Sequence, residues 1–262
     1  MWRRRRKFIS EADWVAALDV LPMLDMLDDG ERVQLRKLSS RFMASKSIEP
    51  VRGQRLETAD LVVIAAQACL PVLALGLDAY APWRSVVVYP GSFVARELEV
   101  DESGVEHEWD EARAGEAWFR GPVILSWEDI LASGQGDGYN VVIHEMAHKL
   151  DMLDGEANGR PPLHRDMDPE TWRRDFSAAF EDLKRRINAG DTPVMDEYAA
   201  ADPGEFFAVA SEYFFDTPGV LEAEYPPVYR RLCEFYRQDP CARLDRSDAV
   251  HRETLTDKGD RE

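Results

Sequence analysis

Cysteine is scarce in this chain of 262 residues. The three cysteines, Cys69, Cys233 and Cys241, are odd in number and widely spaced, and no Cys-x-x-Cys pair occurs. Neither a disulfide framework nor a zinc site made of cysteines is therefore indicated. A reducing compartment suits this composition, so we expect a cytoplasmic protein.

Basic residues are also few. Lys and Arg number 32 against 50 Asp and Glu, which gives a formal net charge of -18. Such a surface repels the phosphates of nucleic acids, so direct binding of DNA or RNA is not expected. The basic run at residues 3–7 predicts only a solvated chain end.

A long uninterrupted apolar segment is missing as well. The longest apolar stretch, residues 61–77, contains Gln67 and Pro71, which favours a buried helix over a membrane span. Glu11 and Asp13 stand where a secretory signal would need apolar residues. With 45% hydrophobic residues the composition is that of a globular protein, and we expect no membrane partner.

The front of the chain has the periodicity of helices. Four leucines recur at helical spacing before Gly30, namely Leu18, Leu21, Leu24 and Leu27. A second helical pattern covers residues 31–46, and a third begins at Thr58, a residue suited to the N-cap. Residues 8–80 are therefore predicted to form a helical subdomain.

The middle of the chain changes character. Residues 84–95 are β-branched and broken by the turn pair Pro90-Gly91, and glycines punctuate the apolar segment 107–127. These features predict a short antiparallel sheet. The compact strand at 121–127 is the candidate edge along which a peptide could pair as an added strand.

Helical patterns then return at 139–151, 168–190, 202–215 and 225–240. Asp168 and Pro169 supply a cap and a first-turn proline for the second of these helices. Residues 81–245 are predicted to form one catalytic region, packed with the front helices, followed by a charged and disordered tail at 246–262. The expected class is α+β, mostly helical with a small sheet.

The segment NVVIHEMAHKLDMLDG, residues 140–155, carries a pattern with known chemistry. On a helix, His144 and His148 lie one turn apart on the same face, where two neutral imidazoles can hold a zinc ion. Glu145 lies beside that face, placed to accept a proton from water rather than to bind the metal. This is the HExxH pattern. An ordinary polar surface helix is the alternative, but the apolar residues before His144 predict a buried helix, where unpartnered polar groups are costly.

A catalytic zinc site needs a third protein ligand. The longer motif HExxHxxGxxH would place it at Asp154, but Asp151 stands where that motif has its glycine, so the chain lacks the easy turn back to the metal. Asp154 stays an alternative third ligand. Asp151 is instead expected to orient a neighbouring group or to cap the helix.

A downstream helix offers two more candidates. Glu205 and Glu212 lie seven residues apart, on one face of that helix. Glu205 also fits a capping box with Asp202, and Glu212 also fits a surface carboxylate or one that supports a metal ligand from outside. The residues alone leave the two glutamates nearly equal.

The segments HEMAHKLDM, DEYAAADPGEFFAVASEYFF and FYRQDP together resemble the Mlc titration factor A family of bacterial zinc metallopeptidases. The resemblance spans most of residues 10–245. It implies a zincin-like fold, similar to the catalytic domain of anthrax lethal factor, in which a glutamate completes the zinc site beside the HExxH helix.

The resemblance also implies roles for particular residues. His144, His148 and Glu205 correspond to the ligands of one Zn2+ ion per chain, and Glu145 corresponds to the general base. Tyr198 corresponds to a tyrosine close to the zinc. Judged without the family, Tyr198 would be read as a half-buried core aromatic. Glu212 is then a candidate to hold a ligand imidazole in one tautomer.

The function implied is a zinc metallopeptidase that hydrolyses peptide bonds of a peptide or protein substrate, with aminopeptidase activity as one form. Members of the family are linked to regulation of glucose uptake through a transcriptional repressor, Mlc, which makes a Mlc-like repressor a candidate partner. The alternative is a zinc-containing binding protein that sequesters such a repressor with little proteolysis.

Overall fold

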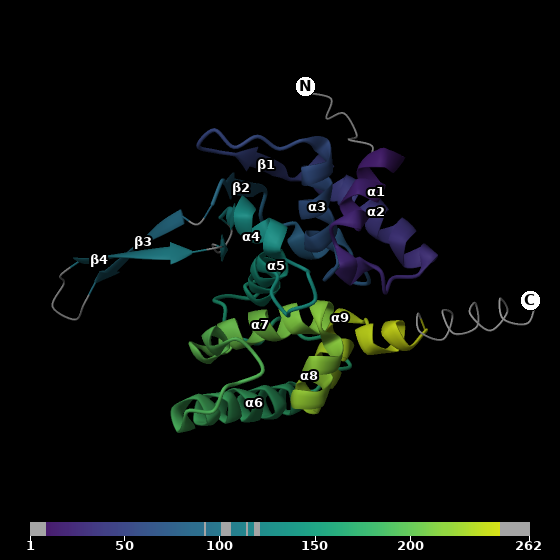
Figure 1. The fold of residues 1–262 in the computed structure, drawn as a ribbon. Helices are drawn as coiled ribbons and strands as arrows, with labels where there is room; N and C mark the ends of the chain where they lie inside the picture. The colour runs from purple at the N-terminus through teal and green to yellow at the C-terminus, as the bar shows by residue number, and fades with distance from the viewer. Residues whose placement is uncertain (1–8, 92, 101–105, 114, 118–120, 247–262) are drawn as a thin grey trace, which may run out of the picture.

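The computed structural model describes residues 9–91, 93–100, 106–113, 115–117 and 121–246. Helices dominate this part of the chain and a small sheet lies beside the HExxH helix, so the expected α+β class is confirmed (Figure 1). The basic run at 3–7 and the tail beyond residue 246 lie outside the described residues. The division into an 8–80 subdomain and an 81–245 region stays a prediction.

The front helices are α1 (Glu11–Asp19), α2 (Asp29–Ser45) and α3 (Thr58–Cys69), with short 3-10 turns at Pro22–Leu24 and Leu77–Tyr80. Helix α2 begins with a capping box, in which Asp28 and Glu31 each accept a hydrogen bond from the other's backbone amide. Helix α3 is capped by Glu57, one residue before the predicted Thr58. The carboxylate of Asp60 accepts the Glu57 amide at 2.8 Å, which fixes that start.

The main sheet has the strand order β1-β2-β6-β5, formed by Ser47–Pro50, Ser85–Tyr89, Val123–Ser126 and Gly115–Ala117. The prediction of an antiparallel sheet is wrong for three of these strands, because β1, β2 and β6 pair in parallel and only β5 runs antiparallel to β6. For the pairing of β1 with β2 the cause is β1 itself, which sequence patterns did not predict. Helix α3 carries the chain from β1 back to the same end of the sheet, and such a crossover makes neighbouring strands parallel.

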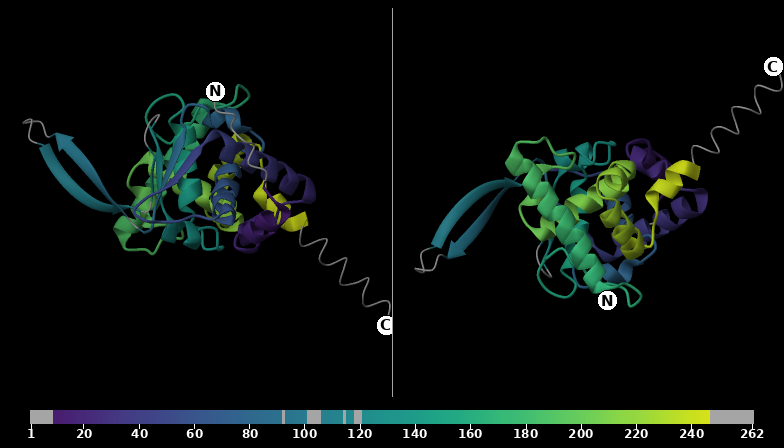
Figure 2. Two further views of the ribbon diagram at one scale, coloured as in Figure 1. Left: turned by 90° about the horizontal axis from the view of Figure 1, so that it is seen from above. Right: turned by 90° about the horizontal axis from the view of Figure 1, so that it is seen from below.

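An antiparallel pair does occur, but as a separate hairpin. Strand β3 (Phe93–Val100) pairs with β4 (Glu106–Arg113) along their whole lengths. The hairpin projects away from the rest of the molecule in every view (Figures 1 and 2). It therefore does not contribute to the sheet beside the HExxH helix.

The remaining helices are α4 (Trp127–Ala132), α5 (Val141–Asp151), α6 (Pro169–Ala189), α7 (Pro203–Asp216), α8 (Pro218–Glu224) and α9 (Pro226–Tyr236), with a 3-10 turn, η3, at Glu197–Ala200. The predicted start of α6 is confirmed, because Asp168 accepts the amides of Glu170 and Thr171 and Pro169 opens the helix. Gly190 ends it in the left-handed conformation.

Helix α7 lies between α5 and α6 (Figure 1) and is buried on nearly every side. Its apolar residues pack on both neighbours. Phe206 meets Phe176 of α6 edge to face, with ring centroids 6.0 Å apart, and Phe207 lies 6.0 Å from Trp172. Because α7 is held from two sides, its polar residues have fixed positions relative to α5. Among the described residues, no helix has the length and apolarity needed to span a membrane.

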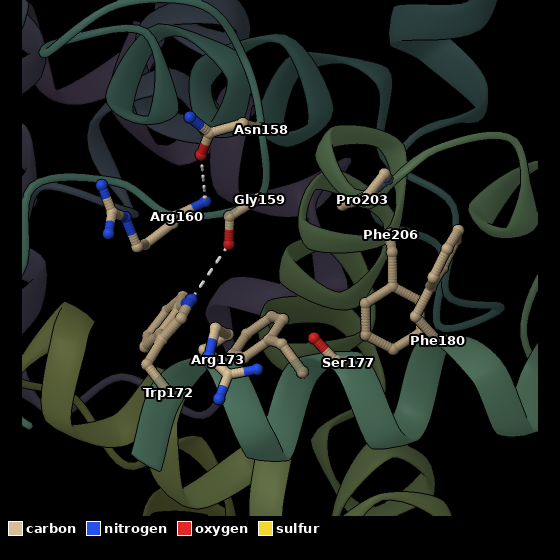
Figure 3. Close-up of a pocket in the computed structure, with 10 residues that line it drawn as sticks. Asn158, Gly159, Arg160, Trp172, Arg173, Ser177, Phe180, Pro203 and Phe206 are labelled. Atoms are coloured by element: carbon tan, nitrogen blue, oxygen red, sulfur yellow. Dashed lines mark hydrogen bonds between the residues drawn. The ribbon is translucent and has the colours of Figure 1, made fainter. Parts of the chain in front are cut away.

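Gly159 is where three of these elements meet. Its amide donates to Asp151 at the end of α5, and its carbonyl accepts the indole N–H of Trp172 in α6 at 3.0 Å. Its φ is +76°, and a Cβ atom there would lie 2.3 Å from the backbone oxygen of Pro203, the first residue of α7. Figure 3 shows the hydrogen bond from Trp172 to Gly159 at the edge of a pocket that is also lined by Phe180 of α6 and Phe206 of α7. A larger residue would push the start of α7 away.

We therefore expect Gly159→Ala to lower the free energy of unfolding by about 3 kcal/mol or more, because backbone strain and a clash with fixed backbone add together. Gly190→Ala is the matched control. Gly190 has φ +81° but nothing within 4 Å of an added Cβ, so only the strain of about 1 kcal/mol applies. Urea unfolding measures both, and equal losses would show that the contact with Pro203 is unimportant.

Candidate metal centre

Helix α5 brings the two histidines together as the i, i+4 spacing predicts. Asn140 caps the helix by accepting the amide of Ile143 at 2.9 Å. One turn apart, the rings of His144 and His148 have centroids 4.8 Å apart, and their Nε2 atoms are separated by 3.1 Å. Both side chains are almost buried, with 12% and 10% of their surface exposed. The two nitrogens therefore face one small volume.

Glu205 of α7 approaches the same volume from the opposite side. Its Oε2 atom lies 3.0 Å from Nε2 of His144 and 3.3 Å from Nε2 of His148. The predicted cap at Asp202 is present, since its carboxylate accepts the amides of Gly204 and Glu205. The Glu205 side chain, however, lies with the histidines. The donor atoms of His144, His148 and Glu205 thus lie within 4.8 Å of one another and could hold a metal ion.

The geometry of these three atoms suits a small divalent cation. A tetrahedral zinc site with bonds of about 2.0–2.1 Å places neighbouring ligand atoms about 3.3 Å apart. The separations here are 3.1, 3.0 and 3.3 Å. Two imidazole nitrogens and a carboxylate are also the ligand types that zinc takes in hydrolytic sites. The residues present therefore fit such an ion.

Glu212 lies behind His144 rather than in this group. Its Oε1 atom is 2.7 Å from Nδ1 of His144, and its Oε2 atom accepts the backbone amide of Asn140 at 2.5 Å. When His144 is neutral and donates its Nδ1 proton to Glu212, the lone pair of Nε2 faces the other two donor atoms, on His148 and Glu205. Glu212 therefore sets both the tautomer of His144 and the start of α5.

The charges of these groups depend on one another. Burial alone would lower the pKa of His144, but hydrogen bonds to Glu205 and Glu212 outweigh burial and hold that pKa well above its usual value. Burial would likewise raise the pKa of Glu205, yet the two histidines outweigh it and hold that pKa far below the usual range. For Glu212, burial prevails over the bond to His144 and raises the pKa. A cation can bind at Nε2 of His144 only when that nitrogen carries no proton.

Glu145 and Tyr198 both lie near His144. Glu145 is in α5 and only 3% exposed. The ammonium group of Lys149, one turn further along, is attracted to Glu145 and donates a hydrogen bond to the carbonyl of Gly121 at 3.0 Å. Tyr198 belongs to η3, is 50% exposed, and has its ring centroid 6.1 Å from that of His144.

The sequence also matches a family of known proteins. A model of the family described as glucose-regulated metallo-peptidase M90 matches residues 1–237. The chain belongs to this family. It is 40% identical to Mlc titration factor A of Cronobacter sakazakii over 233 residues, which are 88% of each chain. The same protein of Yersinia enterocolitica is 39% identical over 238 residues, and that of Escherichia coli is 37% identical over 237. These alignments cover 90% of this chain and 88% and 89% of the two relatives.

Membership of the M90 family confirms the resemblance seen in the sequence and makes the chain a metallopeptidase-family protein. The structure also places the two aspartates that follow the HExxH motif. Asp151 is buried and accepts the amides of Asn158 and Gly159 at 2.8 and 2.7 Å, so it holds the loop after α5. Burial raises its pKa to about 6. Asp154 is exposed and is not one of the three donors.

Two residues of α7 near this centre were not singled out from the sequence. Asp216 is buried and accepts the amides of Gly136 and Gly138, in the loop that leads into α5. Tyr213 packs against the same loop. The spacing of glycines at 134, 136 and 138 was the available signal, since all three have positive φ values.

We expect metal analysis to give about one zinc ion per wild-type chain and almost none in Glu205→Ala, because two histidines alone bind zinc weakly. Glu212→Ala should keep the metal but bind it about 10–100-fold more weakly, because His144 loses the acceptor that orients it. Competition with a chelator measures the affinities. Asp154→Ala is the control and should match wild type. Full zinc content in Glu205→Ala would exclude Glu205 as a ligand.

Proposed function

We propose that the protein is a zinc-dependent metallopeptidase that hydrolyses peptide bonds. The observation that carries the proposal is the group formed by His144, His148 and Glu205, whose donor atoms converge at tetrahedral spacing from two packed helices. Three protein ligands leave one position for water or substrate, which is the arrangement of a catalytic site. A closed structural site would need a fourth protein ligand, and the described residues supply three.

In this proposal His144, His148 and Glu205 would hold the zinc ion. When bound, zinc supplies Lewis acidity, which lowers the pKa of water and polarises a carbonyl group. Glu145 then acts as the general base: it accepts a proton from the attacking water and passes it to the amine that leaves. The near-complete burial of Glu145 supports this role, because it keeps the carboxylate in one orientation beside the donor group.

Tyr198 is proposed to stabilise negative charge on the substrate. Its hydroxyl would donate a hydrogen bond to the carbonyl oxygen as charge develops there. This role is supported by the distance of 6.1 Å between the ring centroids of Tyr198 and His144, whose planes are tilted by 35°. Half of its surface is exposed, as expected for a side chain that contacts an incoming peptide.

The strand expected to bind a peptide must be reassigned. Strand β6 was the candidate, but it pairs with β2 on one side and β5 on the other, so it has no free edge from Val123 to Leu125. Strand β5 is the last in the order β1-β2-β6-β5 and contacts α5. We propose that an extended substrate pairs along the outer edge of β5, close to the candidate metal centre.

The names of the relatives support a link to regulation. They are called Mlc titration factor A, which denotes action on the Mlc repressor. We propose that the protein is cytoplasmic and that a Mlc-like transcriptional repressor is its partner, with a role in regulating glucose uptake. The family description supports a peptidase, for which we propose aminopeptidase activity. The relatives' names support the second candidate, a binding protein, for which we propose little proteolysis.

Replacing the proposed base separates these two functions. Glu145→Gln should retain zinc, still bind a repressor partner, and hydrolyse peptides about 10²–10⁴-fold more slowly, because only the proton acceptor is lost. Mass spectrometry of a peptide mixture measures cleavage and shows whether terminal or internal bonds are cut. The exposed Glu197→Gln is the control. Wild-type hydrolysis by Glu145→Gln with zinc present would contradict the mechanism, and no hydrolysis by wild type would favour the binding function.

A further inference from the structure

The position of Tyr198 depends on the backbone that precedes it. Because half of its side chain is exposed, packing alone fixes the ring less firmly than it fixes a core aromatic. Two neighbours, Met195 and Ala199, are buried, and the carboxylate of Asp196 accepts the amide of Tyr198 at 2.9 Å. The segment from residue 194 to residue 200 must therefore be anchored if the ring is to lie beside His144.

Tyr213 of α7 supplies that anchor. Its hydroxyl donates a hydrogen bond to the backbone carbonyl of Val194 at 3.0 Å, and the backbone of Asp196 bonds to the same hydroxyl. Val194 itself is 49% exposed, so its side chain does little to hold the segment. The Tyr213 hydroxyl thus connects α7 to the residues directly before Tyr198.

The ring of Tyr213 contacts a second segment of the site. Gly138 lies against it so closely that a Cβ atom there would be 2.6 Å from the ring. Gly138 has φ +88°, and its amide donates to Asp216 at 2.7 Å, one turn beyond Tyr213 on α7. Two residues after Gly138, the amide of Asn140 donates to Glu212. Tyr213 therefore touches both the loop that leads to His144 and the segment that leads to Tyr198.

We propose that Tyr213 is a positioning residue that sets the location of Tyr198 relative to His144. The proposal rests on the proposed function, since it assigns Tyr213 to the residue that would stabilise the substrate carbonyl. Burial raises the pKa of the Tyr213 hydroxyl, so the group keeps its proton and remains a donor.

A purely structural role makes different predictions. Tyr229 of α9 is a buried tyrosine whose hydroxyl donates to Asp239 at 2.7 Å and accepts the amide of Cys241. Tyr229→Phe and Tyr213→Phe remove the same group from similar surroundings, and both should lower the melting temperature by a few degrees. Only Tyr213→Phe should also change catalysis and the mobility of residues 194–200.

The test is a double-mutant cycle on the zinc-loaded protein. Tyr198→Phe should lower kcat about 10²-fold, because a donor to the developing oxyanion is lost. Tyr213→Phe should lower kcat about three- to tenfold with KM and zinc affinity unchanged, because the donor is misplaced. In the Tyr198→Phe background the same change should have no further effect, since the residue through which it acts is gone. Tyr229→Phe should leave kcat at the wild-type value.

Amide hydrogen exchange gives a readout that needs no activity. Exchange in residues 194–200 should become faster in Tyr213→Phe and stay unchanged in Tyr229→Phe. Unchanged exchange of residues 194–200 in Tyr213→Phe would overturn the proposal. So would a finding that Tyr213→Phe lowers kcat by the same factor in wild type and in Tyr198→Phe. If Tyr198→Phe itself keeps full kcat, the role of Tyr198 in the proposed function fails instead, while the exchange measurement still decides whether Tyr213 anchors the segment.

Discussion

The imidazole of His144 lies between two carboxylates, and much of the structure follows from that arrangement. Glu205 approaches Nε2 at 3.0 Å and Glu212 approaches Nδ1 at 2.7 Å. Burying a histidine and two acids is unfavourable unless each finds a partner. Both acids belong to α7, so this helix must enter the interior beside α5. Its other faces are then apolar and buried, because they contact the rest of the core.

A helix buried in this way has little freedom to shift. Phe206 and Phe207 pack against aromatic rings of α6, and Gly159 leaves room for the backbone at the start of α7. Because protein interiors are closely packed, such contacts fix the position of the helix. The consequence is a preorganised donor group. The three donor atoms lie about 3 Å from one another because three helices pack together, and not because one loop folds around an ion.

The sequence predicts the local parts of this site well. The i, i+4 spacing places His144 and His148 on one face, and the caps at Asp168 and Asp202 occur where residue types favour them. The features that depend on contacts between distant parts of the chain were harder to predict. A parallel sheet could not be foreseen, because β1 is a short segment, Ser47–Pro50, that contains a glutamate and a proline. The residues alone also did not decide whether Glu205 or Glu212 joins the two histidines. Residues seven apart on a helix point almost the same way, so only the position of α7 along α5 distinguishes the two glutamates.

The position of α7 along α5 explains a regularity in α7. Glu205, Glu212 and Asp216 are separated by seven and four residues, so all three lie on one face. Along α7, these three acids contact successively earlier parts of the chain. Glu205 contacts both histidines, and Glu212 contacts His144 and the amide of Asn140. Asp216 accepts the amides of Gly138 and Gly136. The two helices therefore run antiparallel along this row.

Moving α7 by one turn would separate each acid from its partner at once, which makes the relative position of the helices a cooperative property. Tyr213 lies within the same stretch, between Glu212 and Asp216, and its hydroxyl reaches Val194. The contacts that orient His144 and the contact that holds the segment before Tyr198 thus come from one helix. A change in the position of α7 would displace both sides of the candidate site together, and this shared dependence on one buried helix is the physical reason to treat Glu205, Glu212, Tyr213 and Asp216 as a unit.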